Sequence, residues 1–288
     1  MARIAIVGGG SMGEALLSGL LRAGRQVKDL VVAERLPDRA KYLADTYSVL
    51  VTSLAEAVEN ATFVIIAVKS SDVEPVVGEI AALVAQADED NPEQVFITVA
   101  AGVTTTYLES RLPAGTPVMR VMPNAPALVG AGVSALAKGR FATPEQLKEA
   151  AALFDSVGGV LTVPETQMDA VTAVSGSGPA YFFLMVEALV DAAVGVGLSH
   201  SVASELVAQT MAGSAAMLLD RMEQDRGPGG AATPDISTPA RLRAMVTSPG
   251  GTTAAALRKL ERGGLRAAID DAVQAAKRRS EELRITSE

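Results

Sequence analysis

The sequence lacks cysteine and tryptophan, contains one histidine, His200, and has only four tyrosines and six phenylalanines among 288 residues. Without cysteine the chain has no thiol nucleophile, no disulfide and no cysteine-ligated zinc or iron–sulfur centre. A single histidine excludes a metal site built on two imidazoles, and a serine–histidine–aspartate triad would have to use His200. Enzymatic chemistry, if present, must come from a bound cofactor, from backbone dipoles, or from carboxylate, hydroxyl and amine groups, and no metal is expected.

An excess of basic residues is also missing, since the formal net charge is −8. Nucleic acids and anionic membranes bind basic surfaces, so neither is an expected partner. Residues 1–7 lack the apolar core of a signal peptide. The longest charge-free stretches, such as 121–137 and 170–186, are interrupted by glycine and proline and do not indicate membrane-spanning helices. We therefore expect a cytoplasmic protein.

The first 163 residues alternate short apolar runs with helix-like segments. Their continuous apolar runs are typical of strands buried on both faces, and the alternation predicts a parallel sheet covered by helices. We predict an α/β domain with a doubly wound, mostly parallel sheet over residues 1–163. The predicted strands are 3–7, 29–33, 61–68, 95–99, 117–121, 132–136 and 159–163. The predicted helices are 11–23, 37–46, 72–85, 104–110 and 143–155.

The remaining residues, 164–288, predict an all-α domain rich in alanine, leucine and valine. A stretch of glycine, proline and polar residues at 223–238 predicts a loop within it. The predicted helices are 166–174, 179–196, 200–222, 239–246, 252–261 and 263–283.

A glycine-rich turn follows the first predicted strand. Gly8, Gly10 and Gly13 fit the pattern G-x-G-x-x-G, in which they allow the tight turn, the approach of a pyrophosphate and close helix packing. With Ser11 and Met12, they place the free N–H groups of a helix N-terminus where phosphates bind. This turn predicts a dinucleotide-binding domain of the Rossmann type.

Residues after later strands are predicted to face the same cofactor, because ligands of such sheets bind beyond the carboxyl ends of the strands. Glu34 favours NAD by accepting from a ribose hydroxyl, whereas Arg35 favours NADP by holding a 2′-phosphate, so the preference stays open. The turn formed by Ala67, Val68 and Lys69 is a further candidate.

Asn124, between two prolines, can bond to the cofactor or serve only as a turn asparagine.

Two further glycine-flanked helix starts lie in the second half, at 175–181 and 248–253. A helix N-terminus offers several N–H groups and a positive dipole end, which suit a small carboxylate. Simple capping and close packing would explain the same residues. The candidate substrate residues are Ser177, Ser248, Gly250, Gly251, Thr252 and Thr253.

On these residues the sequence resembles the pyrroline-5-carboxylate reductase family from Arg3 to about Arg284. The most specific stretches are 169–181 and 246–253, and the turns 122–126 and 67–69 match as well. The sequence departs from the family pattern at Ser70, where proline is usual, at Ala125, where threonine is usual, and at 238–244, where the family has His-Pro and Leu-Lys-Asp. Residues 225–237 resemble an insertion just before that segment.

The resemblance implies a Rossmann domain and a helical domain that interleaves with a second subunit, giving a homodimer and in many members a decamer. It implies hydride transfer from NADPH or NADH to C5 of 1-pyrroline-5-carboxylate, which yields L-proline in the last step of proline biosynthesis. It also implies that residues 248–253 hold the substrate carboxylate and that the Thr253 hydroxyl contacts the ring nitrogen or donates a proton to it.

Two alternatives remain open from the sequence alone. A β-hydroxyacid dehydrogenase of similar architecture would need a general base, typically a lysine on a helix of the second domain, and residues 166–222 contain no lysine. A non-catalytic regulator that senses NAD(P) would have no use for the second glycine–threonine helix start.

Overall fold

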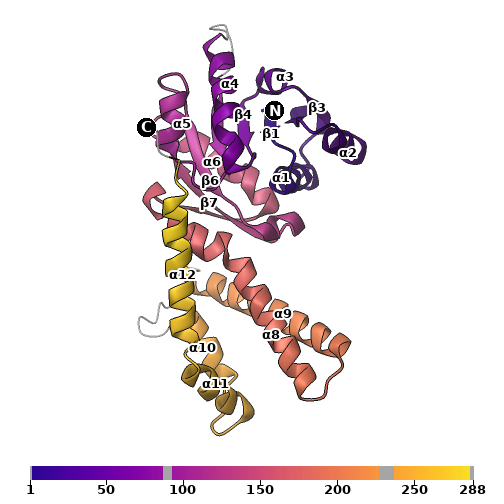
Figure 1. Cartoon of the computed structure of the whole chain (residues 1–288), viewed down its shortest axis with the longest axis vertical. Coiled ribbons are helices and arrows are strands. Elements are labelled where there is room, and N and C mark those ends of the chain that lie inside the picture. The colour runs from indigo at the N-terminus through magenta and orange to yellow at the C-terminus, as the bar shows by residue number, and fades with distance from the viewer. Residues whose placement is uncertain (1, 87–92, 227–236, 286–288) are drawn as a thin grey trace. The chain divides into compact units, whose positions relative to one another are not determined.

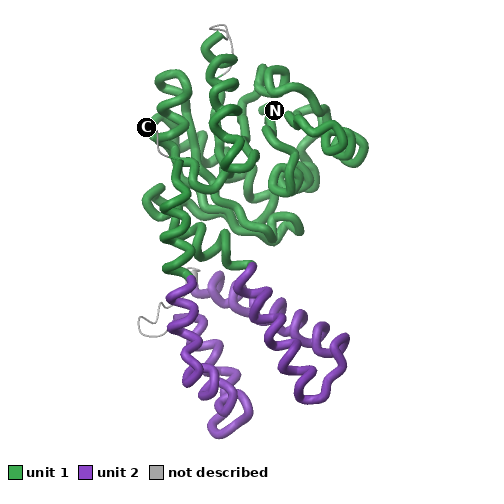
Figure 2. The backbone as a smooth tube through the Cα atoms, in the orientation of Figure 1, with its two compact units in different colours: residues 1–179, 273–288 green, residues 180–272 purple. Residues whose placement is uncertain are grey.

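The computed structural model describes residues 2–86, 93–226 and 237–285. The chain forms two compact units, one of residues 1–179 and 273–288 and the other of residues 180–272 (Figure 2). The first unit therefore includes residues that follow the second unit in sequence. Because its first segment runs to Pro179, its limits differ from the expected division after residue 163, which stays a prediction.

Within the described residues, the first unit is built on one eight-stranded sheet with the order β3-β2-β1-β4-β5-β6-β7-β8. Strands β1, β4, β6 and β7 are labelled in Figure 1. All neighbouring strands are parallel except β6 and β7, which are antiparallel. This topology confirms the predicted mostly parallel sheet. The strands are β1 (Ile4–Val7), β2 (Leu30–Ala33), β3 (Leu50–Thr52), β4 (Phe63–Ile66), β5 (Val95–Thr98), β6 (Val118–Met122), β7 (Gly132–Lys138) and β8 (Gly158–Thr162).

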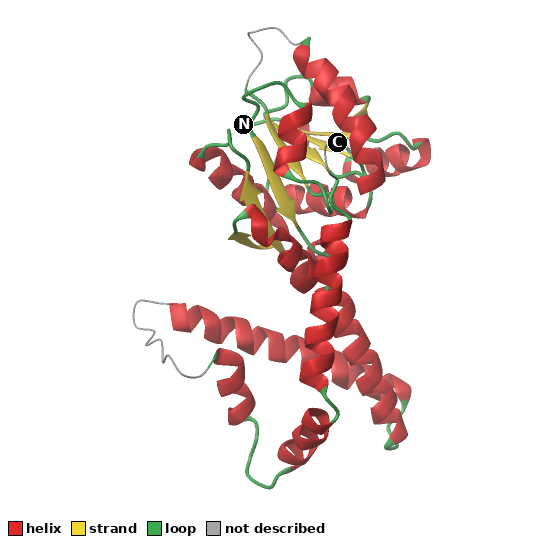
Figure 3. Ribbon diagram, turned by 60° about the vertical axis from the view of Figure 1, so that its left-hand side comes forward, coloured by secondary structure: helices red, strands yellow, loops and turns green. Residues whose placement is uncertain are grey.

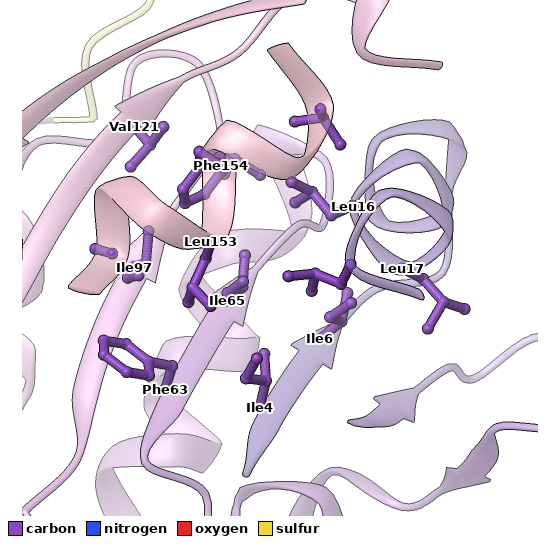
Figure 4. Close-up of a cluster of buried hydrophobic side chains, with 14 of the residues drawn as sticks. Ile4, Ile6, Leu16, Leu17, Phe63, Ile65, Ile97, Val121, Leu153 and Phe154 are labelled. Carbon is purple, nitrogen blue, oxygen red and sulfur yellow. The ribbon is translucent and has the colours of Figure 1, made fainter. Parts of the chain in front are cut away.

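Helices cover both faces of this sheet. Successive strand residues point to opposite faces, so Ile4 and Ile6 belong to one core and Ala5 and Val7 to the other. Figure 4 shows the first core, where α1 and α6 contribute leucine and phenylalanine side chains against β1 and β4. The helices on that face are α1 (Ser11–Arg22), α2 (Pro37–Tyr47) and α6 (Pro144–Phe154). Those on the other face are α3 (Leu54–Val58), α4 (Val73–Ala85) and α5 (Thr105–Arg111).

The sequence-based prediction missed β3 and α3. The strand is only three residues long and lies at the edge of the sheet, where Leu50 is 58% exposed. Its residues therefore lack the continuous buried run that marked the other strands. The helix is one turn of five residues, capped by the Ser53 hydroxyl, which accepts from the Glu56 N–H.

The helical segment after Glu165 is continuous where the sequence predicted a break. Helix α7 (Met168–Val171) continues through a π-helical turn at residues 172–176, and α8 (Gly178–Gly195) follows. The Ser177 N–H donates to the Thr172 carbonyl oxygen at 2.8 Å, which is the i to i+5 spacing of a π-helix. The glycines at 176 and 178 and Pro179 thus widen and restart the helix without ending it, so the expected interruption of 170–186 was wrong.

The second unit contains only helices and loops in its described part (Figure 3). Asp225 joins two of these helices, since it accepts from the Thr238 hydroxyl at 2.6 Å and pairs with Arg241. The predicted loop at 223–238 was wrong at both ends, because residues 223–226 and 238 are helical, while residues 227–236 lie outside the described residues. Besides most of α8, the helices are α9 (His200–Arg226), α10 (Thr238–Met245), α11 (Thr252–Arg262) and the first part of α12 (Leu265–Glu282).

Two helical stretches are long and apolar enough to cross a membrane by length and composition alone. They are Glu165–Gly195 and His200–Asp225, with 17% and 6% of their most apolar windows buried in this single chain. Apolar side chains exposed over such lengths need a covering surface.

A buried carboxylate fixes the end of α12 to the first unit. Asp169, on α7, is 1% exposed and accepts from the Ser280 hydroxyl at 2.7 Å and from Arg284. Arg120 of β6 is also buried, 3.9 Å from Asp169 and 3.8 Å from Glu165. Burial opposes ionisation of Asp169, but the hydrogen bonds from Ser280 and Arg284 outweigh it, so the pKa of Asp169 is lowered.

Gly102, in the turn between β5 and α5, receives the chain after α12. Its φ is +79°, and its carbonyl oxygen accepts from the Ile285 N–H at 3.0 Å. A Cβ at this position would lie 2.3 Å from the Leu283 carbonyl oxygen. Only glycine therefore allows residues 283–285 to pack at this turn.

We expect Asp169→Asn to lower the free energy of unfolding by about 3 kcal/mol, because it takes the facing negative charge from buried Arg120 and breaks the ion pair with exposed Arg284. Urea unfolding at fixed protein concentration measures this loss. Glu282→Gln is the matched control, since its ion pair with Arg279 is exposed and is worth less than about 0.5 kcal/mol.

The Asp169→Asn effect should depend on pH in one direction. Because the folded-state pKa of Asp169 is lowered, its charge stabilises the fold above the unfolded-state pKa of about 3.9 and this stabilisation is lost as pH falls through the folded-state value. The difference from wild type should therefore be full at neutral pH and shrink below about pH 4. A difference that stays constant down to acid denaturation would show that the charge of Asp169 has no part in it.

Candidate functional site: a dinucleotide cleft and a glycine-capped helix start

A cleft of about 550 Å³ opens at the carboxyl ends of β1, β2 and β4 in the first unit. It lies where the order of strands reverses, the place at which doubly wound sheets bind their ligands. Seven of the predicted cofactor residues line it, namely Gly8, Gly10, Glu34, Arg35, Ala67, Val68 and Lys69. The structure thus brings together residues that are separated along the chain by up to two strand–helix repeats.

The three glycines of the turn between β1 and α1 have different surroundings. Gly8 has a φ of +102°, and a Cβ there would lie 2.9 Å from the Ala67 carbonyl group. A Cβ on Gly13 would lie 2.0 Å from the Gly8 carbonyl oxygen, so α1 packs directly on the turn. A Cβ on Gly10 would meet nothing within 4 Å. Gly8 and Gly13 are therefore required by the fold, while the space at Gly10 is free for a ligand.

Helix α1 begins at this turn without a side-chain cap. Gly10 is its N-cap residue, and no side chain accepts from the first turn of the helix. The N–H groups of Ser11, Met12 and Gly13 have no acceptor within the helix by its geometry. The open space at Gly10 and these donors fit the pyrophosphate of a dinucleotide.

Glu34 and Arg35 follow β2 and differ in the contacts that their side chains make. The Glu34 carboxylate accepts from the Gly9 N–H through Oε2 and from the Leu36 N–H through Oε1, both at 2.8 Å. The Arg35 side chain is 80% exposed and pairs with Asp72 at 3.3 Å. Both residues line the cleft, but only Arg35 has a side chain held by a weak, exposed contact.

Arg39 is a site residue that the sequence-based prediction missed. Its Nε–H donates to the Gly9 carbonyl oxygen at 2.6 Å, and its guanidinium pairs with Glu14 in the first turn of α1. Tyr47 also donates to Glu14, at 2.8 Å. Nothing in the sequence signalled these contacts, because a charged residue on a helix does not show which distant backbone group it bonds to.

The same cluster shifts two pKa values. Burial opposes the ionisation of Glu14, but hydrogen bonds from Arg39, Tyr47 and Tyr42 outweigh it and lower the pKa of Glu14. Burial and the hydrogen bond to Glu14 raise the pKa of Tyr47 to about 12. Glu14 is therefore ionised and Tyr47 protonated at neutral pH.

The turn after β4 is tied to the turn after β5. The Ser70 hydroxyl, at the position where the family pattern has proline, donates to the Ala101 carbonyl oxygen at 2.6 Å. The preceding Lys69 is exposed and lines the cleft. The serine thus supplies a hydrogen bond between the turns after β4 and β5 that a proline would lack.

Asn124 does not line the cleft in this structure, and its side chain is engaged with the backbone. Its amide N–H donates to the Ser175 carbonyl oxygen at 3.1 Å, and its amide oxygen accepts from the Val133 N–H at 2.9 Å. Met122 packs on the same π-helical turn, since a Cβ on Gly176 would lie 2.8 Å from its Cε. The two predicted motifs 122–126 and 175–181 therefore meet, and the contact of Asn124 with the cofactor stays a prediction.

The second predicted binding element, in the helical unit, has the geometry of an open helix start. Gly250 has a φ of +72°, and the Gly251 N–H donates to the Ser248 carbonyl oxygen at 3.1 Å. Gly251 is the N-cap of α11 and no side chain caps the helix. Thr252 is exposed and Thr253 half-buried, while Ser177 belongs to the first unit.

These features define a class of protein. A doubly wound sheet with a G-x-G-x-x-G turn and a cleft at its carboxyl edge, joined to a helical unit, is the architecture of NAD(P)-dependent oxidoreductases.

Comparison with known proteins narrows this class. Residues 165–283 match a family model described as pyrroline-5-carboxylate reductase dimerisation, and residues 3–102 match one described as NADP oxidoreductase, coenzyme F420-dependent. Pyrroline-5-carboxylate reductase of Mycobacterium tuberculosis H37Rv is 74% identical over 100% of this chain and 99% of its own length. That of Mycobacterium leprae is 73% identical over the same shares.

Solved structures support the same family assignment. The structure of a pyrroline-5-carboxylate reductase from Coxiella burnetii covers 99% of both chains at 33% identity with a TM-score of 0.87. The Plasmodium falciparum enzyme, solved with NADP bound, covers 99% of this chain and 98% of its own at 26% identity with a TM-score of 0.80. The chain belongs to the pyrroline-5-carboxylate reductase family and is an oxidoreductase of proline biosynthesis.

We expect Gly10→Ala and Gly13→Ala to separate binding from folding. Gly10→Ala places a methyl group in open space, so the unliganded protein should keep its melting temperature within about 2 °C while its affinity for NADPH falls at least about tenfold. Gly13→Ala puts a methyl group against the Gly8 carbonyl oxygen and should itself unfold at a lower temperature. Thermal unfolding without ligand and titration with NADPH measure the two effects. Undiminished NADPH binding by Gly10→Ala would exclude Gly10 from the contact with the pyrophosphate.

Proposed function

We propose that the protein reduces 1-pyrroline-5-carboxylate to L-proline with NADPH or NADH bound in the cleft of the first unit. The observation that carries this proposal is the cleft itself, in which the glycine turn, the end of β2 and the turn after β4 converge. The bound nicotinamide cofactor supplies the hydride. The pyrophosphate would be held at the N-terminus of α1 by Gly8, Gly10, Ser11, Met12 and Gly13, and residues 67–69 would line the same cofactor cleft.

The substrate carboxylate is bound at the start of α11. The N–H groups after Gly250 point out of a helix that has no side-chain cap, and the positive end of the helix dipole favours an anion there. The Ser248 and Thr252 hydroxyls add donors to the carboxylate.

The Thr253 hydroxyl contacts the ring nitrogen. When hydride adds to C5, the electron pair of the C=N bond moves to nitrogen, so the nitrogen changes from a positively charged iminium to a neutral amine. A hydroxyl can accept from the iminium N–H and donate to the new amine lone pair without itself changing charge. The residues therefore need only bind, orient and exclude water, because the protonated imine is already electrophilic at carbon.

A homodimer completes the protein. Side chains of α8 and α9 such as Phe183, Leu184 and Leu219 are 63%, 66% and 68% exposed in the single chain. Between the two helices lies an apolar groove of about 380 Å³ lined by residues including Met185, Leu189, Leu206 and Met211. Contiguous apolar surface of this kind marks an interface. Its occupant is the matching surface of a second copy, which also accounts for helices as apolar as membrane spans in a cytoplasmic protein.

We expect the purified wild-type protein to oxidise NADPH when pyrroline-5-carboxylate is added and to form proline in equal amount. Thr253→Ala should lower kcat/KM by about 1–2 kcal/mol, equivalent to about five- to thirtyfold, because one hydrogen bond to the reacting ring is lost. Thr253→Ser keeps the hydroxyl and should recover most of the rate. The fall in NADPH absorbance measures these rates, with a parallel series in NADH.

Two outcomes would contradict this assignment. Absence of proline formation by the wild-type protein with both cofactors would exclude the proposed reaction. Unchanged steady-state rates for Thr253→Ala would remove the hydroxyl from the mechanism while leaving the reaction intact.

We expect Leu206→Asp to convert the dimer to monomers and to abolish proline formation, because it puts a charge into the apolar groove. Val129→Asp is the matched control, since Val129 is 79% exposed in the first unit and lies far in sequence from the groove. Sedimentation of the wild type should give the mass of a dimer or of five dimers. A monomeric Leu206→Asp protein with full activity would show that one chain suffices for catalysis.

A further inference from the structure

The carboxylate of Glu34 is occupied by the backbone. At the end of the second strand of such a sheet, an acidic residue usually accepts from the adenosine ribose and so favours NADH. In this chain Oε2 accepts from the Gly9 N–H and Oε1 from the Leu36 N–H, both at 2.8 Å. The side chain is thus directed at the glycine turn and at its own backbone.

Arg39 holds the other side of Gly9. Its Nε–H donates to the Gly9 carbonyl oxygen at 2.6 Å, while its ion pair with Glu14 fixes the guanidinium. The two peptide groups that flank the Cα of Gly9 are therefore both bonded to side chains, one to a carboxylate and one to a guanidinium. We call this arrangement of Glu34, Gly9 and Arg39 the Gly9 clamp.

The space at Gly9 is also filled. A Cβ there would lie 2.4 Å from Leu43 Cδ1 and 3.1 Å from Glu34 Oε2. The packing of Leu43 and the hydrogen bonds of Glu34 and Arg39 together hold the Gly9 backbone in one conformation.

A run of three glycines needs such fixing. Residues 8–10 have more conformational freedom than any other tripeptide, and binding a pyrophosphate to a disordered turn would cost the free energy of ordering it. Contacts from outside the turn that are made before the ligand arrives remove that cost. Both NADPH and NADH carry the pyrophosphate, so the clamp serves them equally.

We propose that Glu34 is a positioning residue of the Gly9 clamp, which orders the pyrophosphate turn, and that it does not select between NADPH and NADH. This proposal rests on the proposed function, because it takes the ligand of the cleft to be a nicotinamide dinucleotide.

Arg35 provides the contrast. It lines the same cleft, its side chain is 80% exposed, and its ion pair with Asp72 at 3.3 Å is of the exposed kind that exchanges readily. A guanidinium in this position can pair with a 2′-phosphate, which NADPH has and NADH lacks. Arg35 and Glu34 are neighbours in sequence with opposite expected effects on cofactor selection.

The experiment measures the dissociation constants of NADPH and NADH by nicotinamide fluorescence for wild type, Glu34→Gln, Arg39→Lys and Arg35→Gln. Thermal unfolding of each protein without ligand is recorded beside it. Glu34→Gln loses one of the two side-chain oxygens that accept from backbone N–H groups. It should raise the dissociation constants of NADPH and NADH by about three- to tenfold each, with their ratio unchanged within about twofold. Arg39→Lys keeps the charge opposite Glu14 but lacks the Nε–H donor, and should behave in the same way.

Arg35→Gln shows how a selective position behaves, since it should raise the dissociation constant of NADPH alone. If Glu34→Gln weakens NADH and leaves or strengthens NADPH, Glu34 contacts the ribose and the proposal is overturned. Unchanged constants for both cofactors in Glu34→Gln also overturn it. Should Glu34→Gln not fold, Arg39→Lys carries the same test through the other half of the clamp.

Failure of the proposed function would give a different result from failure of the proposal for Glu34. In that case the wild-type protein binds neither dinucleotide, or forms no proline. When the wild type binds both cofactors and turns over, a changed cofactor ratio in Glu34→Gln refutes only the positioning role of Glu34.

Discussion

The first unit depends on one buried charge. Asp169 is 1% exposed, and such a carboxylate is tolerated only where several donors share it. Those donors come from the far end of the chain, Ser280 and Arg284, and from β6, where Arg120 lies. Burying the charge therefore requires residues 273–285 to return to the sheet after the helical unit. Gly102, which leaves no room for a Cβ beside the Leu283 carbonyl oxygen, is the residue against which the returning chain packs.

The return of residues 273–285 to the first unit affects how the helical unit is held together. Because both of its ends lead into the first unit, α9, α10 and α11 form an excursion of the chain, whose polar links include ion pairs at Asp225 and Glu261. Its apolar residues are spread around α8 and α9 and are exposed in the single chain. A helix that is apolar on most sides is stable only when buried. We therefore infer that the helical unit acquires its core by dimerisation, in keeping with the family model that matches it.

Local and periodic features were predictable from the sequence, and long-range polar contacts were not. Continuous apolar runs and the glycine turn predicted seven of the eight strands, the mostly parallel sheet and most of the residues that line the cleft. They did so because strand burial and turn geometry depend mainly on residues close together in the sequence. The edge strand β3 was missed since it has only three residues and none of them is fully buried. Arg39 and Asp169 were missed for another reason. Each acts through a partner far away in sequence, and a polar residue on a helix looks the same whether it faces water or a distant backbone group.

The two proposed binding elements share one device. Helices α3, α5 and α6 are capped by the side chains of Ser53, Thr104 and Thr143, a contact worth about 1 kcal/mol that uses up an N–H group of the first turn. Helices α2, α4 and α10 also lack a side-chain cap, but of the uncapped helices α1, α2, α4, α10 and α11 only α1 and α11 begin at a glycine, Gly10 and Gly251. The stability forgone there leaves N–H donors free for a pyrophosphate at one start and a carboxylate at the other. A chain with one histidine and no cysteine can thus bind two anions and align a hydride donor with an electrophilic imine using mainly its backbone.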